Sequence, residues 1–425
     1  MKMNLLRAAS WSGVFVILSF ALGGPMSRAA DADWPQFRGP NRDDHSPDHH
    51  LLSSWPANGP TLKWTFNDAG LGYAGYSIVG TRLFTMGLRE EQEYLIAIDT
   101  TNGHPLWAAP VGPKYPNHWG DGPRMTPTVD GDRVYALSAQ GFLICANAQD
   151  GHLFWRKSLV SDLGGKIQEW GFTESPLIVG KVIIVTPGGA EGVMAGLDKR
   201  TGEVLWRTKD VTDATQYSSP IFVEFGGQAQ VVQLITKKLF SVDPANGKLL
   251  WQTDFPGSVA VIPTPIASAD GYLFATAGYN AGCKVVKLAA DGRSVTPVYQ
   301  SKKAMNNHHG GVVLVDDNLY GYSDGPGWIC QELKTGNVLW TDKSLGKGAI
   351  HFADGHLYCL DQNSGEVALI DASPKGWHQT GRFKLTPQST KRSPEGGIWP
   401  HPVVVKGQLY LRDQEILYCF DVNGK

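Results

Sequence analysis

The sequence predicts an all-β protein that folds as an eight-bladed β-propeller. Three observations favour this fold: a short phrase ending in tryptophan recurs along the chain, the runs between its copies alternate apolar and polar residues, and helical periodicity is nearly absent. The copies of the phrase are NGHPLW (102–107), DGHLFW (150–155), TGEVLW (201–206), NGKLLW (246–251) and TGNVLW (335–340).

Each repeat has the same order of elements. Two short alternating runs, such as 133–137 and 142–146, form a hairpin, and a turn with a glycine then leads into the strand that ends in tryptophan. The glycine supplies a positive φ, and an acidic residue four positions earlier accepts backbone N–H groups across the turn. The repeat glycines are Gly103, Gly151, Gly202, Gly247 and Gly336, and the acidic residues are Asp99, Asp198, Asp243 and Glu332.

The number of blades follows from the aromatic residue that ends each repeat, which we call the closing aromatic residue. These residues follow one another at intervals of 41 to 51 residues, the length of a four-stranded blade, and we expect each to wedge between its own blade and the next. They are Trp64, Trp107, Trp155, Trp206, Trp251, Tyr299, Trp340 and Phe383.

The two ends of the repeat array are predicted to close the ring. The strand ending at Trp64 has no blade before it, and the last strands, near 418–421, have no closing strand after them, so pairing the two removes the exposed sheet edges. Seven blades is the alternative, because the segment 361–370 copies the turn pattern but carries Leu369 where tryptophan would stand. We take Phe383 as the closing aromatic of blade seven.

The composition of the chain limits which kinds of partner and site we expect. The chain has 425 residues and a formal net charge of −2, which gives no reason to expect nucleic-acid binding or a basic membrane-binding surface. The five cysteines are not adjacent in sequence, and Cys145 and Cys330 occupy a repeat position where other copies have Ala97, Gly196 or Ser241. The pattern indicates buried small residues rather than disulfides or metal ligands.

The N-terminus is typical of an export signal. A positive start is followed by about 15 apolar residues, short of the roughly 20 that span a bilayer, and cleavage is expected near Ala29 or Ala32. We therefore expect a signal peptide at 1–32, an N-terminal strap at 33–60 and a single propeller domain at 61–425. The mature protein should be periplasmic or extracellular and monomeric, with no membrane span.

The repeat resembles the pyrroloquinoline-quinone (PQQ) repeat, [AC]-x-D-x-x-T-G-x-x-x-W, seen here as Ala97, Asp99, Gly103 and Trp107. Quinoprotein alcohol dehydrogenases share this repeat, as does the propeller lipoprotein that assists outer-membrane protein assembly. The stretches DWPQFRGPNRDDHS (33–46), MNNHHGG (305–311) and GYSDGPGW (321–328) look more like exported PQQ-like propellers common in planctomycete-type bacteria. The resemblance covers essentially the whole mature chain and implies the fold more strongly than any activity.

The resemblance implies a cofactor site in the dehydrogenases that this chain does not reproduce. There, PQQ lies between a tryptophan and a disulfide of adjacent cysteines, beside a Ca²⁺ or lanthanide ion held by Glu, Asn and Asp, with a further Asp as base. This sequence has no adjacent cysteines, and no stretch matches the ion ligands or the base. We expect no cofactor and no metal, and keep PQQ with Ca²⁺ as the alternative.

A ligand site is expected at the mouth of the central channel. Six runs, beginning near 124, 173, 217, 262, 308 and 399, are the candidate innermost strands, and the polar and aromatic residues at their starts should converge on one face. The candidates are Tyr76, Trp119, Arg124, Trp170, Glu174, Tyr217, Asn306, Asn307, His308, His309, Trp399 and His401, with Tyr73, His118 and Gln216 beside them. A metal held by the histidines and Glu174 is less favoured, because adjacent strand residues point to opposite faces.

Three functions remain open. A non-catalytic propeller would bind a small polar ligand or a protein through its central funnel, and the absent cofactor apparatus favours this one. A quinoprotein oxidoreductase acting on an alcohol or sugar would bind PQQ in an unusually open site. An assembly factor for outer-membrane proteins is the third, although no cysteine is placed for a lipid anchor.

Overall fold

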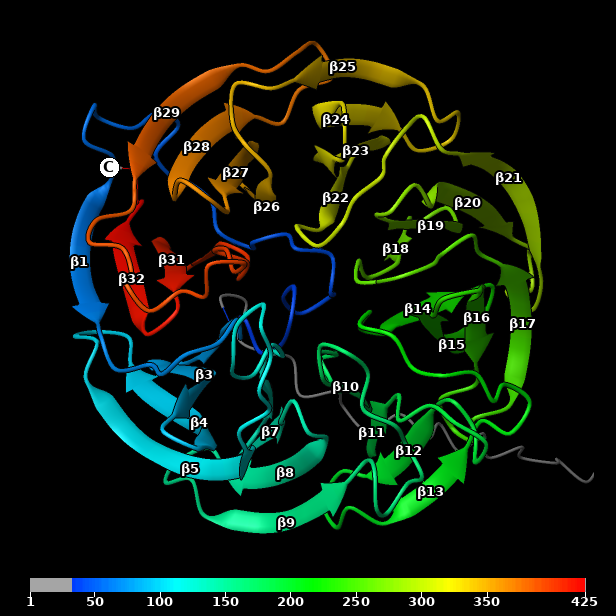
Figure 1. Cartoon of the computed structure of the whole chain (residues 1–425). Coiled ribbons are helices and arrows are strands. Elements are labelled where there is room, and N and C mark those ends of the chain that lie inside the picture. Colours follow the sequence, from blue (N-terminus) through cyan, green and yellow to red (C-terminus); the bar gives the residue numbers. More distant parts are fainter. Residues whose placement is uncertain (1–32, 425) are drawn as a thin grey trace, which may run out of the picture.

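The computed structural model describes residues 33–424, which form a closed ring of eight four-stranded sheets (Figure 1). The prediction of an eight-bladed, all-β propeller is confirmed. The expected signal peptide, residues 1–32, lies outside the described residues. In the described part of the chain, no helix has the length and hydrophobicity needed to cross a membrane.

Each blade is an antiparallel sheet whose innermost strand lines the central channel. Blades 1 and 2 are β2 (Ser77–Val79), β3 (Arg82–Arg89), β4 (Gln92–Asp99) and β5 (Pro105–Pro113), followed by β6 (Thr128–Asp130), β7 (Arg133–Leu137), β8 (Phe142–Asn147) and β9 (Leu153–Ser158). Blade 3 is β10 (Leu177–Val179), β11 (Val182–Val185), β12 (Ala195–Asp198) and β13 (Val204–Arg207). Blade 4 is β14 (Ile221–Phe225), β15 (Gln228–Leu234), β16 (Lys238–Val242) and β17 (Leu249–Asp254). Blades 5 and 6 are β18 (Ile266–Ala267), β19 (Tyr272–Ala277), β20 (Gly282–Leu288) and β21 (Val295–Ser301), followed by β22 (Val312–Val315), β23 (Asn318–Ser323), β24 (Gly327–Glu332) and β25 (Val338–Asp342). Blade 7 is β26 (Gly348–Ala353), β27 (His356–Asp361), β28 (Glu366–Asp371) and β29 (Gln379–Lys384). Blade 8 is β30 (Val403–Val405), β31 (Gln408–Asp413) and β32 (Ile416–Asp421), completed by β1 (Thr61–Phe66).

Blade 8 closes the ring with strands from both ends of the chain. β1 pairs antiparallel with β32, in the register Thr65 to Tyr418 and Trp64 to Cys419. Phe383 lies in β29, opposite Val367, as the closing strand of blade 7. The alternative of seven blades is therefore wrong, because the segment that lacks tryptophan, β28, is the third strand of a complete blade.

The recurring tryptophan faces a small residue across the two outer strands of its own blade. The register pairs Ala97 with Trp107, Cys145 with Trp155, Gly196 with Trp206, Ser241 with Trp251 and Cys330 with Trp340. A Cβ atom on Gly196 would lie 2.1 Å from Cε2 of Trp206, so the indole fills the space that a larger side chain would need. This explains the small residues at the repeat position, and all five cysteines are free and buried.

The same tryptophans join neighbouring blades. The indole N–H of Trp206, in blade 3, donates to the carbonyl of Pro244 in blade 4 at 3.0 Å. A Cβ on Gly247 of blade 4 would lie 2.3 Å from Cε3 of this ring. Gly247 has a φ of 71°, so both its conformation and its lack of a side chain are required. The recurring phrase is thus the turn and outer strand that each blade uses to contact its neighbours.

The N-terminal segment does more than cover the surface as a strap. Residues 34–46 enter the centre of the ring, where the dark blue loop lies in Figure 1. Trp34 bridges Ile78 of blade 1, Val129 of blade 2 donates its N–H to the Pro35 carbonyl, and Ser46 donates to Phe352 of blade 7. The loop therefore contacts the innermost strands of several blades and fills part of the channel.

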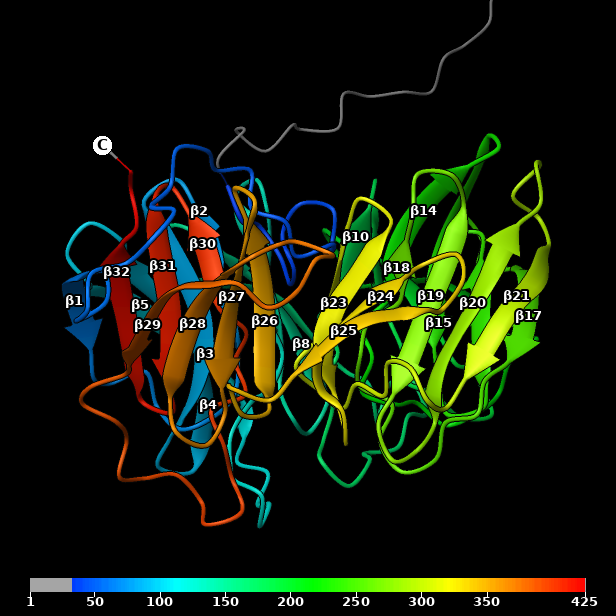
Figure 2. The ribbon, with the colours of Figure 1, turned by 90° about the horizontal axis from the view of Figure 1, so that it is seen from above.

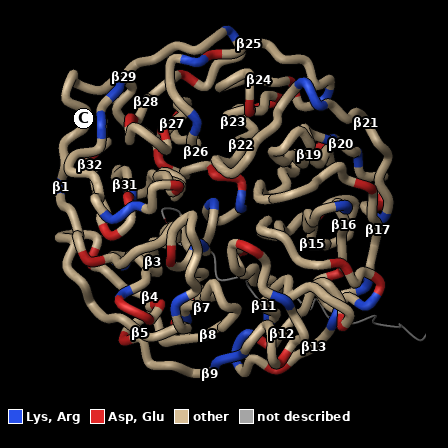
Figure 3. Tube along the Cα trace, viewed as in Figure 1, with Lys and Arg blue, Asp and Glu red and all other residues tan. Residues whose placement is uncertain are grey.

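Two buried arginines hold this loop in the channel. Arg42 donates to the carbonyls of Ser175 and Pro220, which precede the innermost strands of blades 3 and 4. Arg38 donates to the carbonyl of Val312 in blade 6 at 2.6 Å. In the centre of Figure 3, segments of both charge signs occur where the loop crosses the ring axis.

Candidate functional site

A cavity of about 290 Å³ lies at the mouth of the channel, above the N-terminal loop. Its volume is close to the lower end of the range of about 300–1,000 Å³ that is typical of small-molecule sites. Two long loops, 114–127 and 385–402, project from one face of the ring, opposite the face on which the chain ends (Figure 2). They meet where Ser393 donates its hydroxyl to the carbonyl of His118 at 2.6 Å, and together they form one side of the mouth.

Most of the predicted site residues line this one cavity. Those that do are Tyr76, Trp119, Arg124, Trp170, Tyr217, His308, His309, Trp399 and His401, together with Tyr73. They converge because the innermost strands are parallel to the channel and begin at the same end, as the sequence pattern predicts. Their binding role stays a prediction.

Three predicted residues do not line the cavity. Glu174, Asn306 and Asn307 are buried, and their side chains bond to the backbone of Thr186, Gly282 and Gly311, respectively. Asn307, for example, donates to the carbonyls of Gly311 and Tyr322. These hydrogen bonds tie the segments before the innermost strands to other parts of the protein, and a binding role for the three residues stays a prediction. His118 and Gln216 also lie outside the lining.

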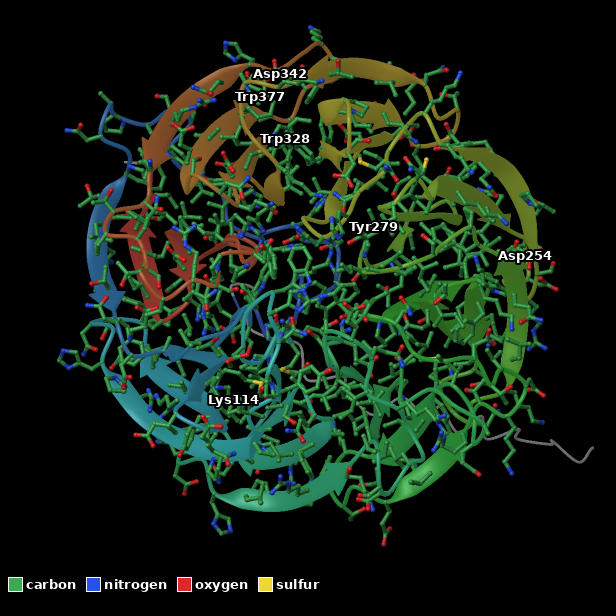
Figure 4. All side chains as sticks on the ribbon, in the orientation of Figure 1. Lys114, Asp254, Tyr279, Trp328, Asp342 and Trp377 are labelled. Carbon is green, nitrogen blue, oxygen red and sulfur yellow. The ribbon has the colours of Figure 1, made fainter. Side chains whose placement is uncertain are left out.

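One wall of the cavity is a continuous row of contacting rings, which we name the aromatic arc. Its members are Tyr279, His308, His309, Trp399 and Tyr73, with the guanidinium of Arg124 at its end. Successive ring centroids lie 4.8, 4.7, 5.6 and 4.4 Å apart, and the Cζ atom of Arg124 lies 5.1 Å from the centroid of Tyr73. Figure 4 shows Tyr279 at the inner end of blade 5, towards the central opening.

Further aromatic groups face the arc from other blades. Trp170 and Tyr217 form an edge-to-face pair with centroids 5.2 Å apart. Trp119 is half-buried, and its carbonyl accepts the hydroxyl of Tyr73 at 2.7 Å. A planar or ring-shaped ligand would therefore meet aromatic surface on more than one side.

Several polar atoms of the cavity lack a protein partner. They are Tyr76 Oη, Thr264 Oγ1, Gln362 Oε1 and Trp399 Nε1, each buried and without a hydrogen bond to residues 33–424. Because buried polar groups are almost always hydrogen-bonded, these donors and acceptors are suited to a polar ligand or to bound water. The cavity thus combines apolar ring faces with specific polar groups.

The floor of the cavity comes from the N-terminal loop, which the sequence predicts only as a strap. Trp34, Phe37, Arg38 and Asp44 line it. Burial alone would raise the pKa of Asp44, but Arg38 and hydrogen bonds with His351 and His401 outweigh it and hold the pKa well below its ordinary value. Asp44 is therefore a permanent anion that balances Arg38. The signal for this role in the sequence is the group of charged residues within a short segment that also contains proline and aromatic residues.

The histidines of the arc are uncharged at neutral pH. Burial, aided by Lys347, lowers the pKa of His308 to about 4, and burial lowers the pKa of His309 further below its ordinary value. Lys347 bonds to Nδ1 of His308 at 2.8 Å and to Asp324 at 2.7 Å. Since the ammonium can only donate, Nδ1 accepts and the ring proton of His308 lies on Nε2.

Glu174 supplies a pH prediction. Burial raises its pKa from 4.5 to about 7, against opposing effects of Thr186 and Arg42. The folded state therefore binds this proton more tightly than the unfolded state does. The contribution of protonated Glu174 to folding stability is fully present below pH 4.5 and is lost as the pH rises through about 7. Glu174→Gln, which stays neutral, should gain in melting temperature relative to wild type between pH 4.5 and pH 8 in scanning calorimetry. A difference that stays constant with pH would contradict this assignment.

The residues present do not fit the PQQ site of the dehydrogenases. No group of three or more His, Cys, Asp or Glu side chains in the described residues is arranged to hold a metal ion. The cysteines are separate and buried in different blades, so no disulfide is placed to cover a quinone. The aromatic arc offers stacking surface, but the set of ion ligands that activates the quinone has no counterpart here.

Comparison with known proteins places the chain in a family. The family model described as outer membrane protein assembly factor BamB matches residues 91–342, more than half of the chain. The assembly factor BamB of Shewanella oneidensis is 24% identical over 284 residues, which are 61% of this chain and 66% of that protein. The chain therefore matches just under two thirds of the length of this relative.

Solved structures show the same fold at low identity. BamB from Moraxella catarrhalis superposes with a TM-score of 0.58 and 16% identity, over 85% of this chain and 99% of that one. The quinohemoprotein alcohol dehydrogenase from Comamonas testosteroni gives a TM-score of 0.63 and 14% identity, over 94% of this chain and 82% of that one. The resemblance to PQQ-like repeat propellers is confirmed, and the chain belongs to the BamB-type family of these propellers.

Proposed function

We propose that this protein is an exported, non-catalytic binding propeller whose central funnel holds a saccharide. The observation that carries the proposal is the aromatic arc, because contacting ring faces beside unpartnered polar atoms suit a ligand with apolar ring faces and hydroxyl groups at its edge. Neutral imidazoles at His308 and His309 add hydrogen-bonding groups without a charge cost. The names of the matched relatives, outer membrane protein assembly factors, agree with export.

A saccharide suits the cavity better than a quinone cofactor. The quinone of the related dehydrogenases depends on an ion held by carboxylates, and the described residues offer no such group. A sugar needs only stacking surface and a few directed donors and acceptors. Trp399 offers both, through its ring face in the arc and its unpartnered indole N–H.

Calorimetric titration of the purified protein with a panel of neutral and acidic disaccharides tests the proposal. At least one member should bind in a saturable way, and Trp399→Ala should weaken it about tenfold, as expected for the loss of one stacking contact. Trp377→Ala is the matched control, since Trp377 is also half-buried but packs against Trp328 and Trp340 away from the funnel (Figure 4).

Two results would overturn the proposal. One is the absence of binding across the panel. The other is an equal loss of affinity in Trp377→Ala and Trp399→Ala, which would place the ligand outside the funnel. Saturable binding of PQQ that requires Ca²⁺ would favour the oxidoreductase alternative instead.

A role in outer-membrane protein assembly is the second candidate. The family match over residues 91–342 favours it, and the 24% identity to the Shewanella oneidensis factor supports it. The test is complementation: the complete chain is expressed in a Shewanella oneidensis strain that lacks its own factor. Restored levels of outer-membrane proteins would support the assembly role, and unchanged levels in the presence of exported protein would contradict it.

A further inference from the structure

Arg124, a half-buried cation of the funnel, differs from the fully buried arginines of the protein. Arg124 lines the cavity, and its guanidinium makes two hydrogen bonds, to the carbonyls of Gly122 at 2.9 Å and Gly120 at 2.8 Å. Arg412, buried between blades 8 and 1, makes five, using all three guanidinium nitrogens. Because a guanidinium carries five N–H donors, Arg124 keeps donors available at the cavity surface.

Within residues 33–424, Arg124 forms no ion pair. The carboxylates whose charge acts on it are those of Glu93 and Asp121. Asp121 pairs with Lys114 at 3.1 Å instead. Glu93 is buried, accepts the N–H of Ala139 at 3.0 Å, and has its pKa raised by burial to about 7. A partly desolvated guanidinium without a carboxylate partner is unfavourable, and an anion bound in the cavity would relieve that cost.

The remaining charges of the cavity are already paired or lie at its rim. Arg38 pairs with Asp44 at 3.5 Å, and Lys347 pairs with Asp324 at 2.7 Å. Glu395, the other carboxylate of the lining, is exposed on the loop 385–402. Within the described lining, Arg124 is therefore the cation without a counter-charge. The arc is neutral from Tyr279 to Tyr73 and positive at its end.

We propose that the ligand of the funnel is an anionic saccharide, whose carboxylate or sulfate group binds Arg124 while its ring stacks on the adjacent arc. This rests on the proposed saccharide function and specifies it. A guanidinium binds either oxyanion through two parallel N–H···O bonds, and its position on the face of Tyr73 fixes the plane of the fork. The tilted Trp399 ring, 4.4 Å from Tyr73 between centroids, lies next along the arc for the sugar.

The test compares charged and uncharged forms of one sugar. The purified protein is titrated with digalacturonic acid, its dimethyl ester, a sulfated galactose disaccharide and the neutral galactose disaccharide. Wild type should bind at least one charged form about ten- to a hundredfold more tightly than its neutral counterpart, as one charge-assisted contact predicts. The preference should shrink at high salt, because ions screen the interaction. Comparison of the uronate and the sulfate distinguishes the two anion types.

Arg124→Gln removes the positive charge and keeps a polar side chain at this position. It should bind the neutral sugar as wild type does and lose the preference for the charged form. Arg156→Gln is the matched control: Arg156 also stacks on an aromatic ring, 4.0 Å from the centroid of Phe142, but is exposed on an outer strand. Equal affinity of wild type for charged and neutral sugars would overturn the anionic assignment and leave the saccharide function standing. Failure of every sugar to bind would overturn both.

Discussion

Replacement of Trp206 by alanine lowers the free energy of unfolding by about 3–5 kcal/mol, the range observed for buried aromatic side chains. Only 7% of Trp206 is exposed, and its ring packs against Gly196 in its own blade and Gly247 in the next. The substitution opens a cavity at a blade interface and leaves the carbonyl of Pro244 without its donor. Denaturant titration followed by circular dichroism measures the change.

Leu205→Ala is the matched control for Trp206. Leu205 is the preceding residue of β13 and is 44% exposed, so its loss should change stability by less than about 0.5 kcal/mol. Gly247→Ala should be destabilising for the converse reason, since its new Cβ would meet the indole and its φ is positive. A cost below about 1 kcal/mol for Trp206→Ala would contradict the assignment of this residue as the contact between blades.

Arg42→Ala is expected to destabilise the protein by at least about 3 kcal/mol, because each buried acceptor left without its charged donor costs roughly 1–3 kcal/mol. Only 2% of Arg42 is exposed, and its loss leaves the carbonyls of Ser175, Pro176 and Pro220 without a donor in the channel. Burial lowers the pKa of Arg42 to about 9, and the nearby Glu174 opposes this shift.

The matching measurement is the shift of the denaturant midpoint, with the exposed Arg156→Ala as the control that should stay within about 0.5 kcal/mol of wild type. Proteolysis adds a local readout, because the segment 33–46 should be cleaved faster when its anchor is lost. Wild-type stability together with unchanged protection of this segment would contradict the role of the loop as the channel's central support.

The blades were predictable because their chemistry repeats. Trp206, Gly247 and Asp198 recur in fixed order, so one physical explanation of the turn applies around the whole ring. Phe383 breaks the pattern but is still predictable, because a blade that ended at the turn near Gly365 would be too short for four strands. The regular repeat of the turn and the outer strand therefore makes the fold predictable from the sequence.

The site was predictable only in part, because its contacts do not repeat. Trp399 and Arg124 could be placed at the mouth from their position before an innermost strand. Glu174 and Asn307 have the same sequence position, but their side chains turn into the protein, and a strand pattern does not show which way a residue in a loop faces. The N-terminal loop was missed because Arg42 finds its partner 133 residues away, a distance that leaves no local signal.

The binding of a saccharide on the aromatic arc is tested most directly by a crystal structure of the protein grown with saturating digalacturonic acid. We predict a sugar ring against the face of Trp399 and a carboxylate within hydrogen-bonding distance of Arg124. A funnel without sugar under saturating conditions, or a sugar bound at the outer strands of the blades, would contradict the account.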